Sequence, residues 1–261
     1  MAERSDEGPV LVFLGPTLPL AEAERTLDAI YLQPSAQGDI LLAAHAFRPR
    51  AMVLIDGQFE DRPAVRHKEI LWAMAQGIVM IGAASMGALR AAELDGFGMI
   101  GVGLVYRWYR RRRLALHADP APDDAVAVHS GPPELGFLPL TDSLIDLQRT
   151  FSALTRRGAI TASERDLLAT IARSMNFRER SLPAVFRAAG WPEERLMVLR
   201  REMVGQKRRD ALLALKNVPR LVMQRGRVSP PGAWIATNTF LRDLEAGGID
   251  SNLVNTYKLN P

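Results

Sequence analysis

Short, wholly apolar runs recur along the first part of this sequence, and each one ends in a turn. They span Val10–Leu14, Ala51–Ile55 and Ile78–Ile81, and a glycine follows each within two residues. Stretches with the helical spacing of apolar residues lie between them, at Leu20–Ile30, Asp39–Phe47 and Val65–Gln76. Apolar strands separated by helices are typical of a parallel sheet that helices cover on both faces. The sequence therefore predicts a doubly wound, Rossmann-like α/β fold.

The second part of the chain has a different pattern. From Thr141 onward no comparable strand occurs, and leucines recur at helical spacing up to Gly158. Thr161 and Glu164 then have the spacing of a capping box, which predicts the start of another helix. Further helices are expected at Leu182–Ala189, Pro192–Leu215 and Gly232–Ala246. We expect two domains, an α/β domain over residues 1–140 that carries the site and a helical domain over residues 141–261.

Composition narrows the class of protein. The apolar fraction of 48% and the charged fraction of 24% are those of a globular chain. The absence of cysteine excludes disulfides, thiolate metal sites and a cysteine nucleophile. No apolar run is long enough to cross a membrane, and the polar start does not resemble a secretory signal, so a cytoplasmic protein is expected. No phosphate loop or metal-ligand spacing occurs, and we expect neither cofactor nor metal.

Basic residues concentrate in one segment. Residues 151–230 hold 17 Lys or Arg against 7 Asp or Glu, a net charge of +10 in a chain of net charge +4. This excess predicts that the helical part docks an acidic protein surface. A solvated helical surface is the plainer interpretation. Nucleic acid is not favoured, because aromatic residues do not alternate with the basic ones.

Ser85 is the first candidate for chemistry. It follows a predicted buried strand, opens a predicted helix and has small neighbours, so it approximates the G-x-S-x-G nucleophile elbow with Ala83 in place of the first glycine. In such a turn the hydroxyl is expected to be exposed, and the amides of Met86 and Gly87 would face an anion. The alternative is that Ser85 is only a helix N-cap.

A serine nucleophile needs a base, and two histidines compete for this role. His67 is predicted at the start of a helix, facing inward at the same sheet edge, where Asp56 or Glu69 would orient it. His129 is predicted to end an edge strand and is the alternative. Arg90 is a supporting residue that could pair with Glu93. The expected substrate-binding residues at this edge are Gly15, Pro16, Thr17, Gly57, Met86, Gly87 and Arg90, while His45 and His117 are expected to be peripheral.

Seven motifs in a fixed order give the first part of the chain a family resemblance. They are FLGPTL (Phe13–Leu18), YLQPSAQGDI (Tyr31–Ile40), IDGQF (Ile55–Phe59), RHKEI (Arg66–Ile70), GAASMGALRAAEL (Gly82–Leu94), GFGMIGVG (Gly96–Gly103) and DDAVAVHSGP (Asp123–Pro132). Together they resemble the TfuA-like family over roughly residues 9–150. The sequence departs from the family pattern at Ala125 and in the arginines between Tyr109 and Leu114.

The resemblance implies a partner of YcaO enzymes in the thioamidation of peptide backbones. YcaO would use ATP, and the TfuA-like protein would provide sulfur from a thiocarboxylated, ubiquitin-like carrier protein. The implied partners are therefore a YcaO protein, the sulfur carrier and the precursor peptide, and a homo-oligomer stays open. The leading hypothesis is a thiocarboxylate hydrolase with Ser85 as nucleophile. The alternatives are a noncatalytic adaptor between YcaO and its peptide, and a generic serine hydrolase.

Overall fold

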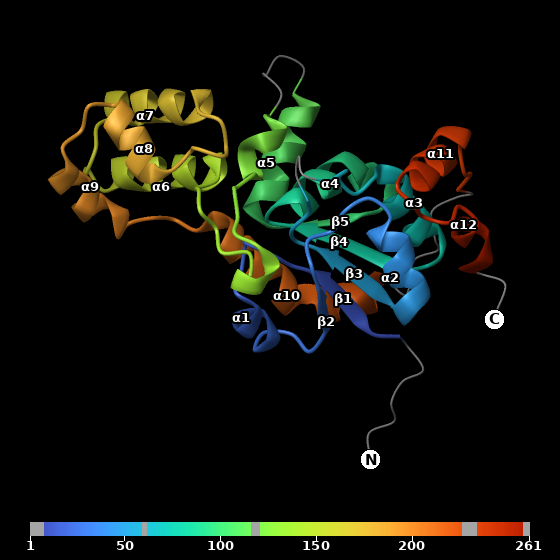
Figure 1. Ribbon diagram of the computed structural model, residues 1–261. Coiled ribbons are helices and arrows are strands. Elements are labelled where there is room, and N and C mark those ends of the chain that lie inside the picture. Colours follow the sequence, from blue (N-terminus) through green and yellow to red (C-terminus); the bar gives the residue numbers. More distant parts are fainter. Residues whose placement is uncertain (1–7, 59–61, 116–120, 226–233, 258–261) are drawn as a thin grey trace.

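A five-stranded parallel sheet forms the centre of the molecule (Figure 1). The computed structural model describes residues 8–58, 62–115, 121–225 and 234–257, so that Phe59, His117 and Gly232 of the predictions above lie outside it. The sheet has the order β2-β1-β3-β4-β5. Its strands are β1 (Val10–Phe13), β2 (Ile30–Leu32), β3 (Ala51–Leu54), β4 (Val79–Ala83) and β5 (Ile100–Val102).

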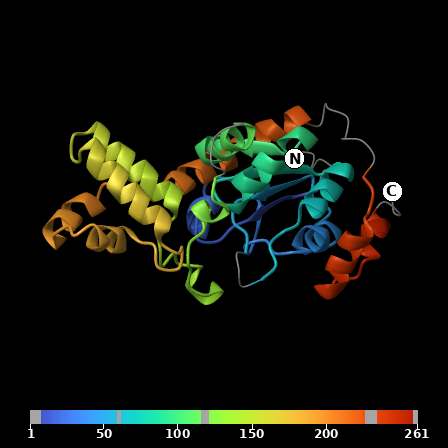
Figure 2. The same cartoon turned by 90° about the horizontal axis from the view of Figure 1, so that it is seen from above.

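Helices cover both faces of this sheet, as expected for a doubly wound α/β fold. One face packs against α2 (Asp39–Phe47), α3 (His67–Ala75) and α4 (Met86–Leu94). The opposite face, which includes Val12, Val53 and Ile81, packs against α10 (Gln206–Arg225), with α1 (Leu20–Glu24) beside it. Figures 1 and 2 show α10 lying across the sheet on the side away from α4. The alternation of side chains along each strand supplies both cores.

The three central strands are those that the apolar runs predict, whereas the edge strands β2 and β5 were not predicted. Both edge strands have only three residues and are only partly buried. The helix expected over Leu20–Ile30 is shorter, because α1 ends at Glu24 and Ile30 already begins β2. The edge strand expected before His129 is wrong as well, since a 3-10 turn, η2 (Asp123–Val126), occupies that position.

The helical part contains a separate lobe, on the left in Figures 1 and 2. Thr161 and Glu164 form the predicted capping box at the start of α7 (Ala162–Ser174). The single helix expected over Pro192–Leu215 is two helices, α9 (Glu193–Arg200) and α10, with a break that includes Gly205. The lobe consists of α6 (Leu144–Arg156), α7 (Ala162–Ser174), α8 (Leu182–Ala188) and α9 (Glu193–Arg200).

The remaining helices return to the α/β body. After α10, helices α11 (Asn238–Ala246) and α12 (Leu253–Thr256) lie on the right in Figure 1, near α2 and α3. The Trp72 indole of α3 donates a 2.9 Å hydrogen bond to the Val254 carbonyl. The predicted domain boundary at residue 140 stays a prediction. Helices α10, α11 and α12, which follow this boundary in the sequence, pack into the hydrophobic cores of the α/β part.

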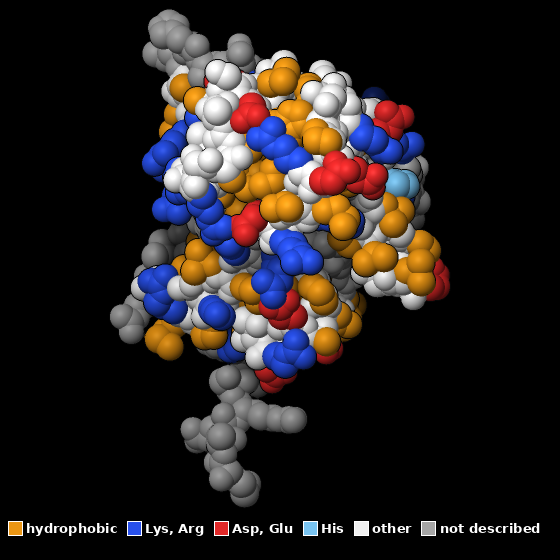
Figure 3. Space-filling model, turned by 90° about the vertical axis from the view of Figure 1, so that its left-hand side faces the viewer, with side chains coloured by type: hydrophobic (Ala, Val, Ile, Leu, Met, Phe, Trp, Pro, Cys, Tyr) orange, Lys and Arg blue, Asp and Glu red, His pale blue; other side chains and the backbone are white. Residues whose placement is uncertain are grey.

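The basic segment is distributed over several surfaces. Residues 151–230 include most of the lobe and also α10, which lies against the sheet. Arg180 and Lys207 are buried. On the lobe side, Lys and Arg side chains are interspersed with acidic and apolar ones (Figure 3). Docking of an acidic surface therefore stays a prediction. None of the helices in the described ranges combines the length and the hydropathy needed to cross a bilayer.

Candidate functional site

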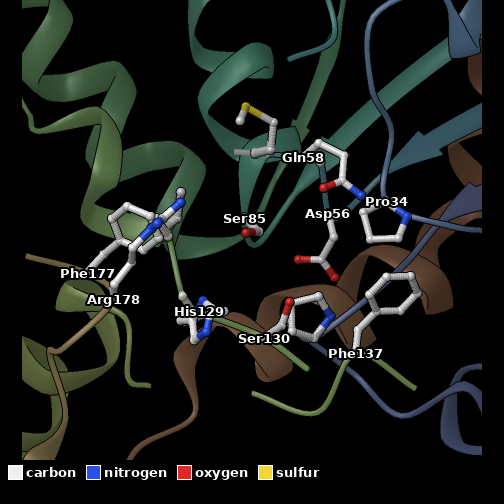
Figure 4. Close-up of a pocket in the computed structure, with 15 residues that line it drawn as sticks. Pro34, Asp56, Gln58, Ser85, His129, Ser130, Phe137, Phe177 and Arg178 are labelled. Carbon is white, nitrogen blue, oxygen red and sulfur yellow. The ribbon is translucent and has the colours of Figure 1, made fainter. Parts of the chain in front are cut away.

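A small cavity lies at the carboxyl ends of β1, β3 and β4 (Figure 4). Its volume is about 80 Å³. From β1 the chain first adds β2 on one side and then β3, β4 and β5 on the other, so the topological switch point lies between β1 and β3. Doubly wound sheets usually bind their ligands at such a point. We call it the Ser85 cavity. Its lining residues are Pro16, Pro34, Asp56, Gly57, Gln58, Ser85, Met86, Val126, Ala127, Val128, His129, Ser130, Phe137, Phe177 and Arg178.

Ser85 is held in the cavity wall by a tight turn. Only two residues connect β4 to α4, and the Ser85 amide donates a 2.7 Å hydrogen bond to the Ala83 carbonyl across Ala84. Ala84 has a φ of 66°, so this is a three-residue turn of the strained kind. Strain of this type costs on the order of 1–3 kcal/mol and concentrates at functional sites. The turn is the sharp strand-to-helix connection that a nucleophile elbow requires.

The Ser85 side chain is less exposed than predicted. Ser85 is only 7% exposed, because its side chain lies in the wall of the cavity and not on the outer surface. Its hydroxyl makes no capping hydrogen bond to α4. It also has no hydrogen-bond partner among the other described residues. The N-cap alternative therefore leaves the hydroxyl unexplained, whereas a nucleophile would have its oxygen open to the cavity.

The two amides after Ser85 differ in their availability. The Gly87 amide donates to the Ile55 carbonyl at 3.2 Å, so the prediction that it faces an anion is wrong. Glycine is needed there because a Cβ would lie 1.8 Å from the Leu54 carbonyl oxygen. The Met86 amide is at the first position of α4, where helical amides have no partner within the helix. It is the better donor to a developing oxyanion.

Asp56 organises the neighbouring loop. Its buried carboxylate accepts hydrogen bonds from the Gly15 amide at 2.9 Å, the Thr17 amide at 3.1 Å and the Thr17 hydroxyl at 2.6 Å. Both carboxylate oxygens are thereby used, and neither orients His67. Asp56 fixes the turn after β1, which places Pro16 at the cavity. Of the expected substrate-binding residues, Pro16, Gly57 and Met86 line the cavity, while Gly15 and Thr17 support it through Asp56.

His67 does not line the Ser85 cavity. Its Nε2 lies 2.7 Å from a Glu93 carboxylate oxygen, and Arg90 donates to the same oxygen at 2.7 Å. These hydrogen bonds hold the pKa of Glu93 below its ordinary value although burial acts to raise it. Glu93 is eight residues beyond Ser85 on α4, about 12 Å along a helix. The geometry therefore opposes the prediction that His67 and Arg90 serve Ser85.

His129, the alternative base, does line the cavity (Figure 4). It begins a hairpin over residues 129–140, in which the Gly131 amide donates to the Leu138 carbonyl and the Leu140 amide to the His129 carbonyl. Ser130 and Phe137 of the same hairpin also face the cavity. The motif DDAVAVHSGP contains His129 and Ser130 and was the signal that could have identified this wall.

Two lining residues had no signal in the sequence. Phe177 and Arg178 come from the connection between α7 and α8, whereas Gln58 belongs to the motif IDGQF and lies in the loop after β3. The helical lobe thus contributes to one wall of the cavity. Lys207 of α10 donates a 2.7 Å hydrogen bond to the carbonyl of Val126, which lines the cavity. Burial lowers the pKa of Lys207, and the nearby Asp56 and Asp146 carboxylates oppose that shift.

Glu69 has a structural position outside the cavity. Its carboxylate is fully buried and accepts hydrogen bonds from the Gly38 amide at 2.7 Å and the Arg66 amide at 3.0 Å. It therefore joins the start of α2 to the start of α3. Burial raises the pKa of Glu69 from 4.5 to about 7, although the amide hydrogen bonds act in the opposite direction. No contact with His67 supports the predicted orienting role.

The raised pKa of Glu69 predicts a pH dependence of stability. The folded state binds the Glu69 proton more tightly than the unfolded chain, so the stabilisation that Glu69 contributes is fully present below pH 4.5 and is lost as pH rises through about 7. The expected loss is about 3 kcal/mol. Urea unfolding at several pH values should show it, and Glu69→Gln should remove this slope. Glu164→Gln is the control, because hydrogen bonds from Arg195 and Thr161 lower the pKa of Glu164 to about 2, so that well above pH 4.5 Glu164 is ionised in both the folded and the unfolded chain. An unchanged slope in Glu69→Gln would contradict the prediction.

The size and polarity of the cavity limit what it can hold. Cavities for cofactors and drug-sized ligands usually have volumes of about 300–1,000 Å³, well above that of the Ser85 cavity. Within the described parts of the chain, no group of three or more His, Asp or Glu residues could bind a metal ion. A cavity of this size suits a small chemical group, such as the end of a chain. The Ser85 hydroxyl, the His129 imidazole and the Met86 amide lie around it.

Comparison with known proteins finds one family. The model of the family described as "TfuA-like protein" matches residues 56–181, which confirms the resemblance seen in the motifs. The matched segment begins at Asp56 and continues past Arg178, so it contains all lining residues of the Ser85 cavity except Pro16 and Pro34. A search of curated proteins found no significant match. The match associates the chain with YcaO thioamide systems in general, since TfuA-like proteins are partners of YcaO proteins.

Proposed function

Because residues 56–181 match the TfuA-like family, we propose that this protein releases sulfide from a thiocarboxylated carrier protein for a YcaO enzyme that makes peptide thioamides. The observation that carries the proposal is the Ser85 hydroxyl, which lies on a strained turn in the wall of a cavity that fits only a small group. The carrier, the precursor peptide and the YcaO enzyme are the proposed partners.

The proposed reaction has two steps. First, the Ser85 oxygen attacks the carbonyl carbon of the thiocarboxylate while the hydroxyl proton passes to His129; His129 then gives this proton to the departing sulfur as the carbon–sulfur bond breaks, so that hydrosulfide leaves and the imidazole is neutral again. The product is an ester between the carrier's terminal acyl group and Ser85. In the second step His129 activates water, which cleaves this ester to a carboxylate and restores the hydroxyl. One water is consumed, and no oxidant or reductant is required.

Several features of the cavity support the proposed mechanism. The Met86 amide would donate to the oxyanion that develops in both steps, and the helix dipole of α4 adds to that stabilisation. Asp56 holds the opposite wall in place through the Gly15 and Thr17 amides. The small volume would admit a terminal glycine and exclude larger carboxyl termini. The proposed reaction needs no nucleotide, so the use of ATP is assigned to the YcaO enzyme.

A direct assay tests this function. A small ubiquitin-like protein ending in a glycine thiocarboxylate is incubated with the full chain, and sulfide is followed with a colorimetric reagent. The expected result is catalytic release of sulfide, with the carrier converted to the carboxylate, as intact-protein mass spectrometry would show. Release no faster than without the protein, both alone and with a YcaO enzyme present, would refute the proposal.

A further inference from the structure

A second, larger cavity adjoins the Ser85 cavity. Its volume is about 260 Å³ and its lining is mostly apolar. Phe137 lines both cavities, and Gly15 of the second directly precedes Pro16 of the first. We call it the apolar cavity. Its lining residues are Leu14, Gly15, Leu18, Leu20, Tyr31, Leu32, Gln33, Pro133, Gly136 and Phe137.

The polar groups in this second cavity are few. The Tyr31 hydroxyl donates to the carbonyls of Ala23 and Leu27, both at 2.8 Å, so the residue offers its ring to the cavity. Gln33 supplies the one side-chain amide of the lining. Leu20 lies at the rim with 51% of its surface exposed. Binding is favoured when a cavity of this kind buries an apolar side chain, because apolar surface is removed from water.

The residue between the two cavities has an unusual backbone. Phe137 has a φ of 56°, which is rare for a bulky residue. It is fixed near the tip of the 129–140 hairpin by a hydrogen bond from its amide to the Pro132 carbonyl. The same hairpin exposes three leucines, Leu135, Leu138 and Leu140, each more than half exposed. A strained aromatic residue among exposed leucines indicates that this hairpin meets an apolar part of a ligand.

We infer that the two cavities form one binding site for the extended carboxyl-terminal tail of a protein, with the terminal glycine in the Ser85 cavity and a bulky apolar side chain upstream in the apolar cavity. This inference rests on the proposed function for the identity of the terminal group. The two volumes carry it, because the small polar space fits a glycine end and the larger apolar one fits a leucine-sized side chain. Phe137 would contact the backbone that passes between them.

A peptide series tests the site without any chemical step. Labelled peptides of serine and glycine end in glycine with an ordinary carboxylate, and a single leucine is moved one position at a time away from the end. Fluorescence anisotropy measures the Kd for the full chain. Side chains of an extended peptide alternate in direction, so tight binding should occur at one register and be lost at its immediate neighbours. At that register, leucine should bind at least tenfold more tightly than serine.

Variants of the protein locate the leucine. Leu20→Glu puts a charge at the rim of the apolar cavity and should weaken the leucine peptide about tenfold while leaving the all-serine peptide unchanged. Glutamate at the first position of α1 is favourable for the helix, so folding should persist. Leu167→Glu is the matched control, since Leu167 is 48% exposed on α7 and lines neither cavity.

The outcomes separate this inference from the proposed function. Equal binding of leucine and serine peptides at every register, or no binding of any of them, would overturn it, even if sulfide release from a thiocarboxylate were observed. Loss of leucine-peptide binding in both Leu20→Glu and Leu167→Glu would also overturn it, because the effect would not belong to the apolar cavity. Binding in one register without sulfide release would support the site and reject the hydrolytic chemistry.

Discussion

Ser85→Ala is expected to reduce sulfide release from a thiocarboxylated carrier by a factor on the order of 10³ or more, because it removes the atom that forms the acyl intermediate. The fold should not change, since the Ser85 hydroxyl has no hydrogen-bond partner among the described residues and makes no cap to α4. The matched control is Ser130→Ala, a serine in the same cavity that is not at the strand-to-helix turn. It should retain activity within a few-fold of the unchanged protein.

A reconstituted thioamidation reaction separates this role from that of an adaptor. If Ser85 releases sulfide, thioamide formation by the YcaO enzyme should fail with Ser85→Ala and recover when inorganic sulfide is added. An adaptor would support thioamide formation equally well with Ser85→Ala and without added sulfide. That result would contradict the prediction and would favour the adaptor. Turnover of activated esters comparable to that of the thiocarboxylate would favour the generic serine hydrolase instead.

His129→Gln is expected to have the second largest effect, a decrease in sulfide release of about 10²- to 10⁴-fold, the range typical of losing a general base. His129 lines the Ser85 cavity, and its ring would accept the hydroxyl proton. The matched control is His67→Gln, which should lower activity only slightly because His67 is paired with Glu93 and lies outside the cavity lining. Thermal unfolding of both variants checks that any loss is not a loss of folded protein.

The opposite pattern would return the role to His67. A large decrease in His67→Gln and full activity in His129→Gln would mean that the hairpin moves away and that another arrangement of α3 forms during the reaction. Equal activity of both variants and the unchanged protein would transfer proton acceptance to water. In either case the prediction that His129 is the base would be wrong, while the role of Ser85 would stand on its own test.

The sequence predicted the position of Ser85 at the sheet edge correctly and that of His67 wrongly, and the difference follows from the lengths of the two connections. Two residues join β4 to α4, so the strand end fixes Ser85 at the carboxyl edge of the sheet. The connection from β3 to α3 is much longer, with twelve residues, and the start of α3 is therefore free to lie away from that edge. Connections of this kind usually have about 2–6 residues. His67 was predicted at the site because the helix that follows a strand was expected to begin at the same edge of the sheet.

Other parts of the fold and site depend on contacts that a local pattern does not contain. The central strands β1, β3 and β4 are apolar throughout because both of their faces are covered, and this composition allowed them to be predicted from the sequence. The edge strands β2 and β5 are short and only half-buried, so their composition is less distinctive. Phe177 and Arg178 reach the cavity only because the helical lobe packs beside it. Their position follows from tertiary structure alone.

The order of synthesis gives α10 a further importance. The last strand of the sheet ends at Val102, whereas the helix that covers the second face begins at Gln206, roughly a hundred residues later. At about 5–20 residues per second, a ribosome needs roughly 5–20 s to make that interval. During this time Val12, Val53 and Ile81 lack α10, although their strands have already been synthesised. This face of the sheet therefore gains most of its cover late in translation, and until α10 has emerged the nascent chain carries an exposed apolar surface of the kind that favours aggregation.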